Sequence, residues 1–328
     1  MSNVESRPVA AEDSDIRLDR WFKRHFPALG HARLEKLLRT GQIRVDGKRA
    51  NAGHRVTAGQ IVRIPPLGKL APLISRPTQS SPSRRDVALV LGAILHRDDH
   101  VIVIDKPPGL AVQGGTAIDR HLDAMLDALS FGGERPRLVH RLDKDTSGVL
   151  VLARTADAAR KLTAAFRDKD ARKIYWAAVV GLPKPRQGRI DLALAKQSGP
   201  AGERVAEDEE GKRAITDYRT VSNAGDKIAW VALRPLTGRT HQLRAHMAAL
   251  GTPILGDGKY GGAASHPAGV PDSRKLHLHA RAIALPHPAG GILRAEAPLP
   301  SHMKRTWEFF GFDENDERDP FAGFADLD

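Results

Sequence analysis

Apolar residues recur at helical spacing near the start of the chain, in two runs separated by a segment with proline and glycine. The two runs are Leu18, Trp21, Phe22 and Phe26, and then Leu34, Leu37 and Leu38. A period of three to four residues places each run on one face of a helix. We expect the second helix to end at Gly41, since glycine is favoured just beyond a helix C-terminus.

Short alternating segments follow the second predicted helix. Residues 43–45 and 48–50 flank Asp46-Gly47. This dipeptide favours a two-residue hairpin turn, because glycine adopts positive φ without strain. A further strand is expected at residues 61–64, where Pro65-Pro66 stops it.

The longer remainder of the chain mixes both periods. Buried-strand candidates lie at residues 101–104, 149–152, 174–180 and 228–233. One helix is expected after Thr155, which can cap it, and another over residues 240–250. These elements alternate without the regular period of a Rossmann fold or a TIM barrel.

Changes in composition along the chain predict five segments. They are a disordered extension at 1–15, a two-helix and hairpin module at 16–66, a linker at 67–86, a large domain at 87–312 and an acidic tail at 313–328. The linker is rich in proline, glycine and serine. An acidic stretch at 199–212 inside the large domain is expected to be a solvated loop.

The charge balance points to a polyanionic partner. The net charge is +12, and residues 17–55 hold eleven Lys or Arg against three acids. Such a basic region typically binds nucleic acid. The chain has no cysteine, so disulfides, thiolate zinc sites and cysteine nucleophiles are excluded. Neither a signal peptide nor a membrane span is apparent, and a cytoplasmic protein that does not bind membranes is expected.

Three polar segments between apolar strands are candidates for the chemistry, since functional loops occupy such places. They are residues 140–148, 173–177 and 237–246. The first combines a carboxylate, cations and hydroxyls immediately before a buried strand, which would hold the loop rigid. In the second, alternation places Tyr175 on the face opposite Ile174 and Trp176. An aromatic ring in that position could stack on a nucleobase or simply fill the core.

The third segment contains His241 and Arg244, three residues apart and therefore on one face of a helix. His241 and His246 are five residues apart and do not converge on a metal ion. His277 and His279 share one side of a strand but lack a clear third ligand. We therefore predict no metal site. No glycine-rich phosphate loop is present, and no cofactor is expected.

Residues 16–64 resemble an S4 domain, a small RNA-binding module. The resemblance rests on residues 17–19, 37–47 and 58–62. Cations on its second helix and hairpin are candidates for phosphate contacts. These candidate RNA-binding residues are Arg33, Lys36, Arg39, Arg44, Lys48 and Arg49.

The large domain resembles the RluA family of pseudouridine synthases over roughly residues 95–299. The motifs that carry this resemblance lie at residues 105–110, 140–148, 238–244, 253–257 and 275–280, together with Tyr175. The S4 module in front resembles the branch of the family that modifies large-subunit ribosomal RNA. The fold implied is α+β, with a mixed, mostly antiparallel sheet and flanking helices. The partner implied is structured RNA, 23S rRNA or a precursor large subunit, bound by a monomer.

The resemblance also implies roles for individual residues. Asp143 would be the catalytic carboxylate, Arg141 would fill the place of a flipped uridine, and Tyr175 would stack on the target base. Arg244 would pair with Asp143 and keep it ionised. The expected supporting residues are His140, Leu142, Thr146, Ser147, Gly148, Arg239 and His241.

Several alternatives stay open at this point. Asp143 could attack the ribose covalently or drive elimination as a base. The substrate could be tRNA, or the chain could be an RNA-binding or ribosome-assembly protein without catalysis. A hydrolase using Asp143 and Asp145 would need a carboxylate pair set across its substrate, which their spacing does not by itself provide.

Overall fold

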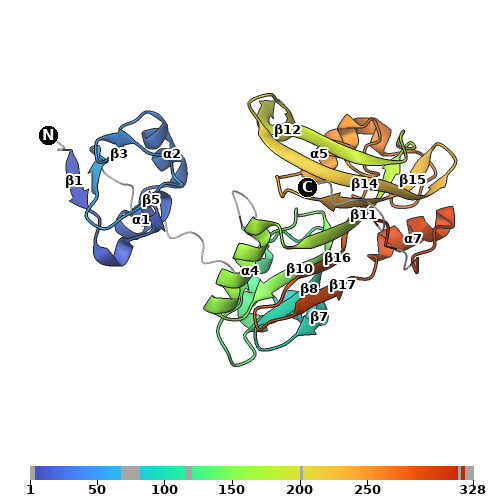
Figure 1. Ribbon diagram of the computed structural model, residues 1–328, viewed down its shortest axis with the longest axis horizontal. Helices are drawn as coiled ribbons and strands as arrows, with labels where there is room; N and C mark the ends of the chain where they lie inside the picture. Colours follow the sequence, from blue (N-terminus) through green and yellow to red (C-terminus); the bar gives the residue numbers. More distant parts are fainter. Residues whose placement is uncertain (1–3, 68–81, 115–119, 200–201, 317–318, 322–328) are drawn as a thin grey trace. The chain divides into compact units, whose positions relative to one another are not determined.

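The chain divides into two compact units, Met1–Ser80 and Ser81–Asp328 (Figure 1). The computed structural model describes residues 4–67, 82–114, 120–199, 202–316 and 319–321. None of the helices in these ranges is long and apolar enough to cross a membrane.

The first unit contains two helices packed on short strands. Its elements are β1 (Glu5–Pro8), η1 (Ala11–Asp13), β2 (Ile16–Arg17), α1 (Leu18–His25), α2 (His31–Arg39), β3 (Arg44–Val45), β4 (Lys48–Arg49), β5 (Arg55–Val56) and β6 (Ile61–Ile64). The predicted helices, hairpin and final strand are all present. Asp46 and Gly47 have φ values of 48° and 75°, as the tight hairpin turn requires. Gly41 ends α2 with a φ of 69°.

The expected disorder of residues 1–15 is wrong for residues 4–15. Strand β1 pairs antiparallel with β6, from Glu5 opposite Ile64 to Pro8 opposite Ile61. Val9 is buried in the core of the unit. The free edge of β6 supplies the hydrogen-bonding partners for this polar segment, whose sequence carries no periodicity of its own.

The second unit is built on one large sheet. Its strands are β7 (Ile94–Arg97), β8 (Val101–Lys106), β9 (Arg137–Leu138), β10 (Ser147–Ala153), β11 (Arg172–Val180), β12 (Gln187–Gly199), β13 (Gly202–Glu207), β14 (Lys212–Ala224), β15 (Ile228–Pro235), β16 (Leu278–Pro286) and β17 (Ile292–Glu296). The order is β13-β12-β14-β15-β11-β16-β10-β8-β7, with β17 on β16 and β9 on β10. Among these strands β10 and β16 pair in parallel and the other pairs are antiparallel. The predicted mixed, mostly antiparallel α+β fold is confirmed.

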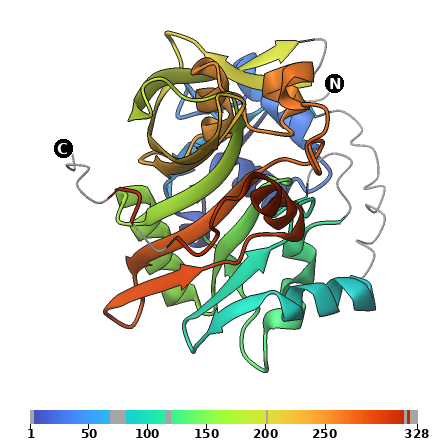
Figure 2. The ribbon, with the colours of Figure 1, turned by 90° about the vertical axis from the view of Figure 1, so that its right-hand side faces the viewer.

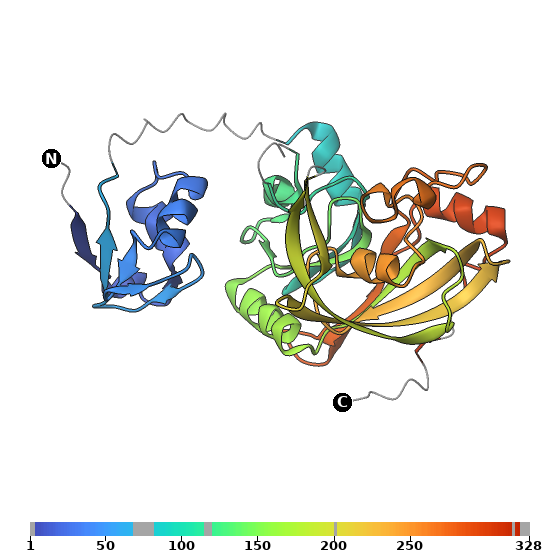
Figure 3. The same cartoon turned by 90° about the horizontal axis from the view of Figure 1, so that it is seen from above.

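Helices cover both faces of this sheet (Figures 1 and 2). They are α3 (Arg84–Gly92), η2 (Leu122–Leu129), α4 (Ala156–Asp168), α5 (Gln242–Ala249), α6 (Gly258–Gly261), η3 (Gly262–Ser265) and α7 (Ser301–Phe310). The Thr155 hydroxyl caps α4 by accepting from the Ala158 amide at 3.1 Å, as predicted. Helix α5 lies within the concave side of the long curved strands β12 and β14 (Figure 3).

Strict alternation along the strands separates the two faces. In β10, Leu150 and Leu152 pack with η2, whereas Val149 and Val151 pack with α4. In β11, Tyr175 contacts the cores beside η2 and α5. Its neighbour Trp176 packs with α7 on the other face, so the predicted opposition of these two side chains is confirmed.

Two segments that were predicted to be irregular, the linker and the acidic stretch, are partly regular in the structure. Most of the predicted linker, residues 68–81, lies outside the described residues, but Ser83 caps α3 with Asp86 in a capping box, so residues 84–86 are helical. The loop expected at 199–212 is wrong for residues 202–207, which form β13 and pair with β12, whereas residues 208–211 form a turn. A local signal for this hairpin is weak, because both strands are mostly polar.

The acidic tail also packs against the domain over part of its length. Phe321 is buried near Trp230 and Trp307, and Arg219 donates to the Pro320 carbonyl at 3.0 Å. Arg172 pairs with Asp319 at 2.6 Å. Residues 322–328 lie outside the described part of the chain.

Candidate active site

The loop between β9 and β10 carries Asp143 and is held at both ends by buried residues. Leu142 is buried in the core beside η2. Thr146 and Ser147 are buried as well, and the Thr146 amide donates to the Asp143 carbonyl at 3.2 Å. The Asp143 side chain itself is 22% exposed. A partly exposed carboxylate thus stands on a turn that buried neighbours hold in place.

Lys106 is hydrogen-bonded to the loop that carries Asp143. Its side chain is fully buried, and its Nζ donates to the carbonyls of Pro107, Leu110 and Lys144 at 2.9 to 3.0 Å. Burial lowers the pKa of Lys106 to about 8, although nearby carboxylates act in the other direction. Because an ammonium has three donors, these carbonyls satisfy it completely. The Lys144 carbonyl belongs to the residue next to Asp143, so the contact fixes the loop.

Gly148 allows the parallel strand β16 to approach. It has a φ of 106°, and a Cβ there would lie 2.2 Å from the Ala280 carbonyl oxygen. One residue earlier, the Ser147 hydroxyl and His279 Nδ1 are hydrogen-bonded at 2.9 Å. These contacts attach the end of the Asp143 loop to β16.

His140 supports the same loop from the opposite side. Its Nε2 accepts a hydrogen bond from the Val151 amide at 2.8 Å, and its ring stacks on Phe166 with a centroid distance of 4.3 Å. Burial lowers the pKa of His140 to about 3. The imidazole is therefore neutral at neutral pH and makes structural contacts.

The residues opposite Asp143 come from the start of α5. His241 lies directly before this helix, and its Nε2 is 4.0 Å from Asp143 Oδ2. Arg244 follows one turn later, but it does not pair with Asp143 as expected. Its Nε and Nη2 donate to the two carboxylate oxygens of Asp257, each at 2.7 Å. Asp257 caps α6 and is buried, so it satisfies the arginine from within the wall.

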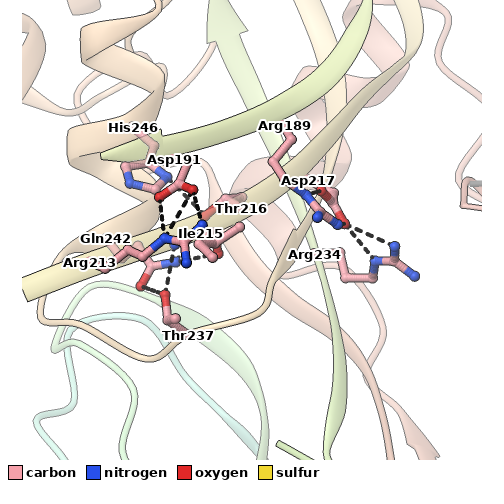
Figure 4. Close-up of polar contacts among 10 residues, drawn as sticks. All are labelled: Arg189, Asp191, Arg213, Ile215, Thr216, Asp217, Arg234, Thr237, Gln242 and His246. Carbon is pink, nitrogen blue, oxygen red and sulfur yellow. Dashed lines mark hydrogen bonds and ion pairs between the residues drawn. The ribbon is translucent and has the colours of Figure 1, made fainter. Parts of the chain in front are cut away.

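A polar network holds the segment before α5 (Figure 4). The Gln242 carbonyl oxygen accepts from the Thr237 hydroxyl at 2.7 Å and from the Arg239 amide at 3.0 Å. Its amide group donates to the Ile215 carbonyl and the Thr216 hydroxyl. All hydrogen-bonding capacity of this buried side chain is used, which anchors residues 237–241 to β14.

These elements surround a cavity of about 830 Å³. Its lining residues are Pro108, Gly109, Asp143, Lys144, Asp145, His241, Arg244, Gly256, Gly258, Lys259, Arg274, Lys275, Leu276, Pro300, Ser301 and His302. Such a volume accepts a nucleotide-sized ligand. The structure therefore brings Asp143, His241 and Arg244 to one cavity, with additional cations along its wall.

Tyr175 lies close enough to interact electrostatically with Asp143. Burial, followed by the negative charge of Asp143, raises the pKa of the Tyr175 hydroxyl. The ring is half-buried between the core beside η2 and the core beside α5. Tyr175 thus packs against both cores, and its role as a stacking platform stays a prediction.

Two arginines that were predicted to belong to the site, Arg141 and Arg239, are not among the residues that line the cavity. Arg141 is exposed and has no hydrogen-bond or ion-pair partner among the described residues. Arg239 is exposed and its Nε donates to the Arg213 carbonyl at 3.2 Å. The six candidate RNA-binding cations of the first unit are all exposed, and none of the six pairs with an acid in the described part of the chain.

The sequence left several residues of the site without a role. The cavity is lined in part by Lys259, Arg274 and Lys275. Two further residues contact lining side chains: Tyr260 contacts His241, and Asp257 pairs with Arg244. Their positions follow from the tertiary fold. The one local signal was the aspartate before a short glycine-flanked helix, a typical N-cap. His277 and His279 bond within the core rather than to a shared ligand.

Comparisons with known proteins identify the family to which the chain is similar. The family model described as RNA pseudouridylate synthase matches residues 100–249. Ribosomal large subunit pseudouridine synthase C of Rickettsia bellii (strain RML369-C) is 37% identical over 296 residues, covering 88% of this chain and 96% of that protein. The protein of the same name from Salmonella typhi is 34% identical over 313 residues, covering 93% and 96%. The solved structure of Human RNA Pseudouridylate Synthase Domain Containing 4 is 30% identical with a TM-score of 0.58, covering 69% of this chain and 95% of that one.

Proposed function

The chain belongs to the RluA family of RNA pseudouridine synthases, and we propose that it isomerises specific uridines of large-subunit ribosomal RNA with Asp143 as its catalytic carboxylate. The observation that carries the proposal is the position of Asp143. It is a half-exposed carboxylate on a rigid loop, at a cavity that also holds His241 and Arg244.

The reaction requires no net gain or loss of atoms. The bond between N1 of uracil and C1′ of ribose breaks, the base rotates, and a bond forms between C5 and C1′. The proton at C5 then leaves, and N1 gains one. A fixed carboxylate can trap the electron-poor C1′ or remove a proton from the ribose, and either route suits Asp143. Preorganised cations around it stabilise the charges that develop.

Access to the target base requires that it leave the RNA helix. Flipping a base costs a few kcal/mol of stacking and pairing. Arg141, exposed and without a partner in the described ranges, is suited to fill the space left behind. Tyr175, whose hydroxyl is near enough to be influenced by the charge of Asp143, is suited to stack on the flipped uracil.

The first unit supports a ribosomal RNA substrate. We assign it as an S4 RNA-binding domain, because its second helix and hairpin expose the six candidate cations, which have no acidic partners among the described residues. Such cations neutralise phosphates. The relatives named above are large-subunit enzymes by name, so 23S rRNA or a precursor large subunit is the proposed substrate. We propose a cytoplasmic monomer that needs no cofactor.

The test is pseudouridine mapping of total RNA from cells that lack the gene, complemented with wild type or Asp143→Asn. Discrete 23S rRNA positions should lose pseudouridine, and wild type alone should restore them. Loss at tRNA positions instead would replace the substrate assignment. Restoration by Asp143→Asn would refute the catalytic assignment, and release of free uracil in vitro would favour a hydrolase.

A further inference from the structure

His241 has a backbone conformation that few residues adopt. Its φ and ψ are 52° and 19°, in the left-handed region, directly before α5. A residue with a Cβ is held there at some cost in energy, and such positions cluster at functional sites. The Gln242 network described above fixes the segment, and the conformation turns the imidazole toward Asp143.

A chain of hydrogen bonds determines which nitrogen of His241 carries the proton. The Val205 amide in β13 donates to the Tyr260 hydroxyl oxygen at 3.0 Å. That oxygen is 2.9 Å from His241 Nδ1. Among the described residues, Nδ1 is the acceptor for the hydroxyl proton, and the carboxylate that faces Nε2 can only accept a proton, so the hydroxyl donates to Nδ1. A neutral His241 then carries its proton on Nε2, the nitrogen that faces Asp143.

The surroundings keep this imidazole neutral at neutral pH. Burial lowers the pKa of His241, and the positive charges of Arg244 and Lys259 act in the same direction. Asp143 and Asp257 oppose them without reversing the shift. With Tyr260, these are the titratable and charged groups that face the ring. The Nε2–H is thus a neutral donor directed at a carboxylate.

We propose that His241 is a positioning residue for Asp143, held by Tyr260 so that its Nε2–H contacts Asp143 Oδ2 during the reaction. The present separation of 4.0 Å exceeds a hydrogen bond by about 1 Å, so the contact forms when either side chain shifts by that amount. The contact holds the carboxylate in a single orientation. This inference rests on the proposed function. It adds the role of β13, whose backbone amide sets the orientation of Tyr260.

The test uses the full-length enzyme in single-turnover assays on an rRNA fragment that contains a mapped target uridine. His241→Asn suits the left-handed backbone and can keep the contact with Tyr260, but has no group at the Nε2 position. Its rate constant should fall at least about tenfold, since hydrogen bonds to charged groups are the strong ones. RNA affinity should stay within about twofold. The acid limb of the rate profile should move to higher pH, because the ionised carboxylate has lost a donor.

Two further variants distinguish positioning from general support of the fold. His241→Gln places an amide N–H near the position of Nε2 and should recover part of the lost rate. Tyr260→Phe removes the group that fixes the tautomer, and should lower the rate and move the acid limb in the same direction as His241→Asn. Equal loss in His241→Gln and His241→Asn, with an unmoved acid limb, would overturn the proposal. So would a loss of rate that comes with lower melting temperature and weaker RNA binding.

The outcome for wild type separates the two proposals. A wild-type enzyme without pseudouridine-forming activity contradicts the proposed function. An active wild type that His241→Asn matches in rate and pH profile contradicts the role of His241 alone.

Discussion

Arg244 and Asp257 form a bidentate ion pair in the wall of the active site, with both N–O distances at 2.7 Å. Asp257 is buried, and the Arg244 side chain is nearly so. The arginine also lies over the Tyr260 ring at 5.0 Å. The pair therefore couples α5, which His241 directly precedes, to α6, which carries Tyr260.

Asp257→Asn should destabilise the protein by about 3 kcal/mol, because removal of one partner leaves a buried charge uncompensated. Urea unfolding measures this change. Arg244→Lys should also be destabilising, since lysine cannot reproduce a bidentate contact. Asp272→Asn is a suitable control, because that aspartate pairs with the exposed Lys275 and Arg305 and its loss should cost about 1 kcal/mol or less. Equal effects of the Asp257 and Asp272 substitutions would contradict a structural role for the buried pair.

Asp143→Asn should lower turnover at least about 1,000-fold, because the amide can neither attack the sugar nor accept a proton. RNA binding should stay within a few fold, as measured by filter retention. Asp145→Asn is the matched control: it lines the same cavity two residues away and is exposed. That variant should keep most of the activity. Comparable losses in both variants would support a two-carboxylate mechanism instead.

Replacing three cations of the first unit should weaken RNA binding in a salt-dependent way. The triple variant is Lys36→Gln, Arg39→Gln and Lys48→Gln. Each lost phosphate contact should reduce the slope of log affinity against log salt by about 0.7 to 0.9. The control changes three exposed cations of α4 and its end, Arg160, Arg167 and Lys169, to Gln. An unchanged slope in the first variant would argue against an RNA-binding first unit.

Gly148→Ala should destabilise the protein by about 2 kcal/mol or more. The new Cβ would lie 2.2 Å from the Ala280 carbonyl oxygen, at a positive φ that L residues avoid. Thermal unfolding measures the loss. Gly238→Ala, where a Cβ meets nothing within 4 Å, should shift the melting temperature little. A stable Gly148→Ala enzyme would mean that β10 and β16 can separate locally without cost.

Stability should fall as the pH drops from about 6.5 toward 4. Burial lowers the pKa of His140 to about 3, and lowers those of His246, His277 and His279 to about 4, from an ordinary value of 6.5. Within this window the unfolded chain binds protons that the folded protein does not. Each imidazole therefore removes up to about 1.4 kcal/mol of stability per pH unit. Urea unfolding at pH 7, 6 and 5 measures the slope, and a flat dependence would contradict the burial of these rings.

Features that depend on neighbouring residues could be predicted from the sequence. Asp46-Gly47 makes its own turn, Thr155 caps its own helix, and alternation alone separates Tyr175 from Trp176. In these cases the physical cause lies within a few residues of its effect.

Features that depend on distant partners could not be predicted. The sequence shows an arginine three residues after His241. It does not show that this arginine pairs with Asp257 and not with Asp143. Likewise, the sequence alone does not show that three backbone carbonyls, one of them 38 residues away, surround the Lys106 ammonium. Strand β1 has no pattern of its own and forms because β6 leaves an edge open.

The parallel pairing of β10 with β16 has a consequence for the order of events during synthesis. Ser147 bonds to His279, 132 residues later, and Gly148 pairs with Ala280. Contacts of such long range form late, because a long loop must close first. The contacts that attach the Asp143 loop to β16 can therefore form only after β16 has left the ribosome. A nascent chain has no assembled catalytic site until most of its length has been made.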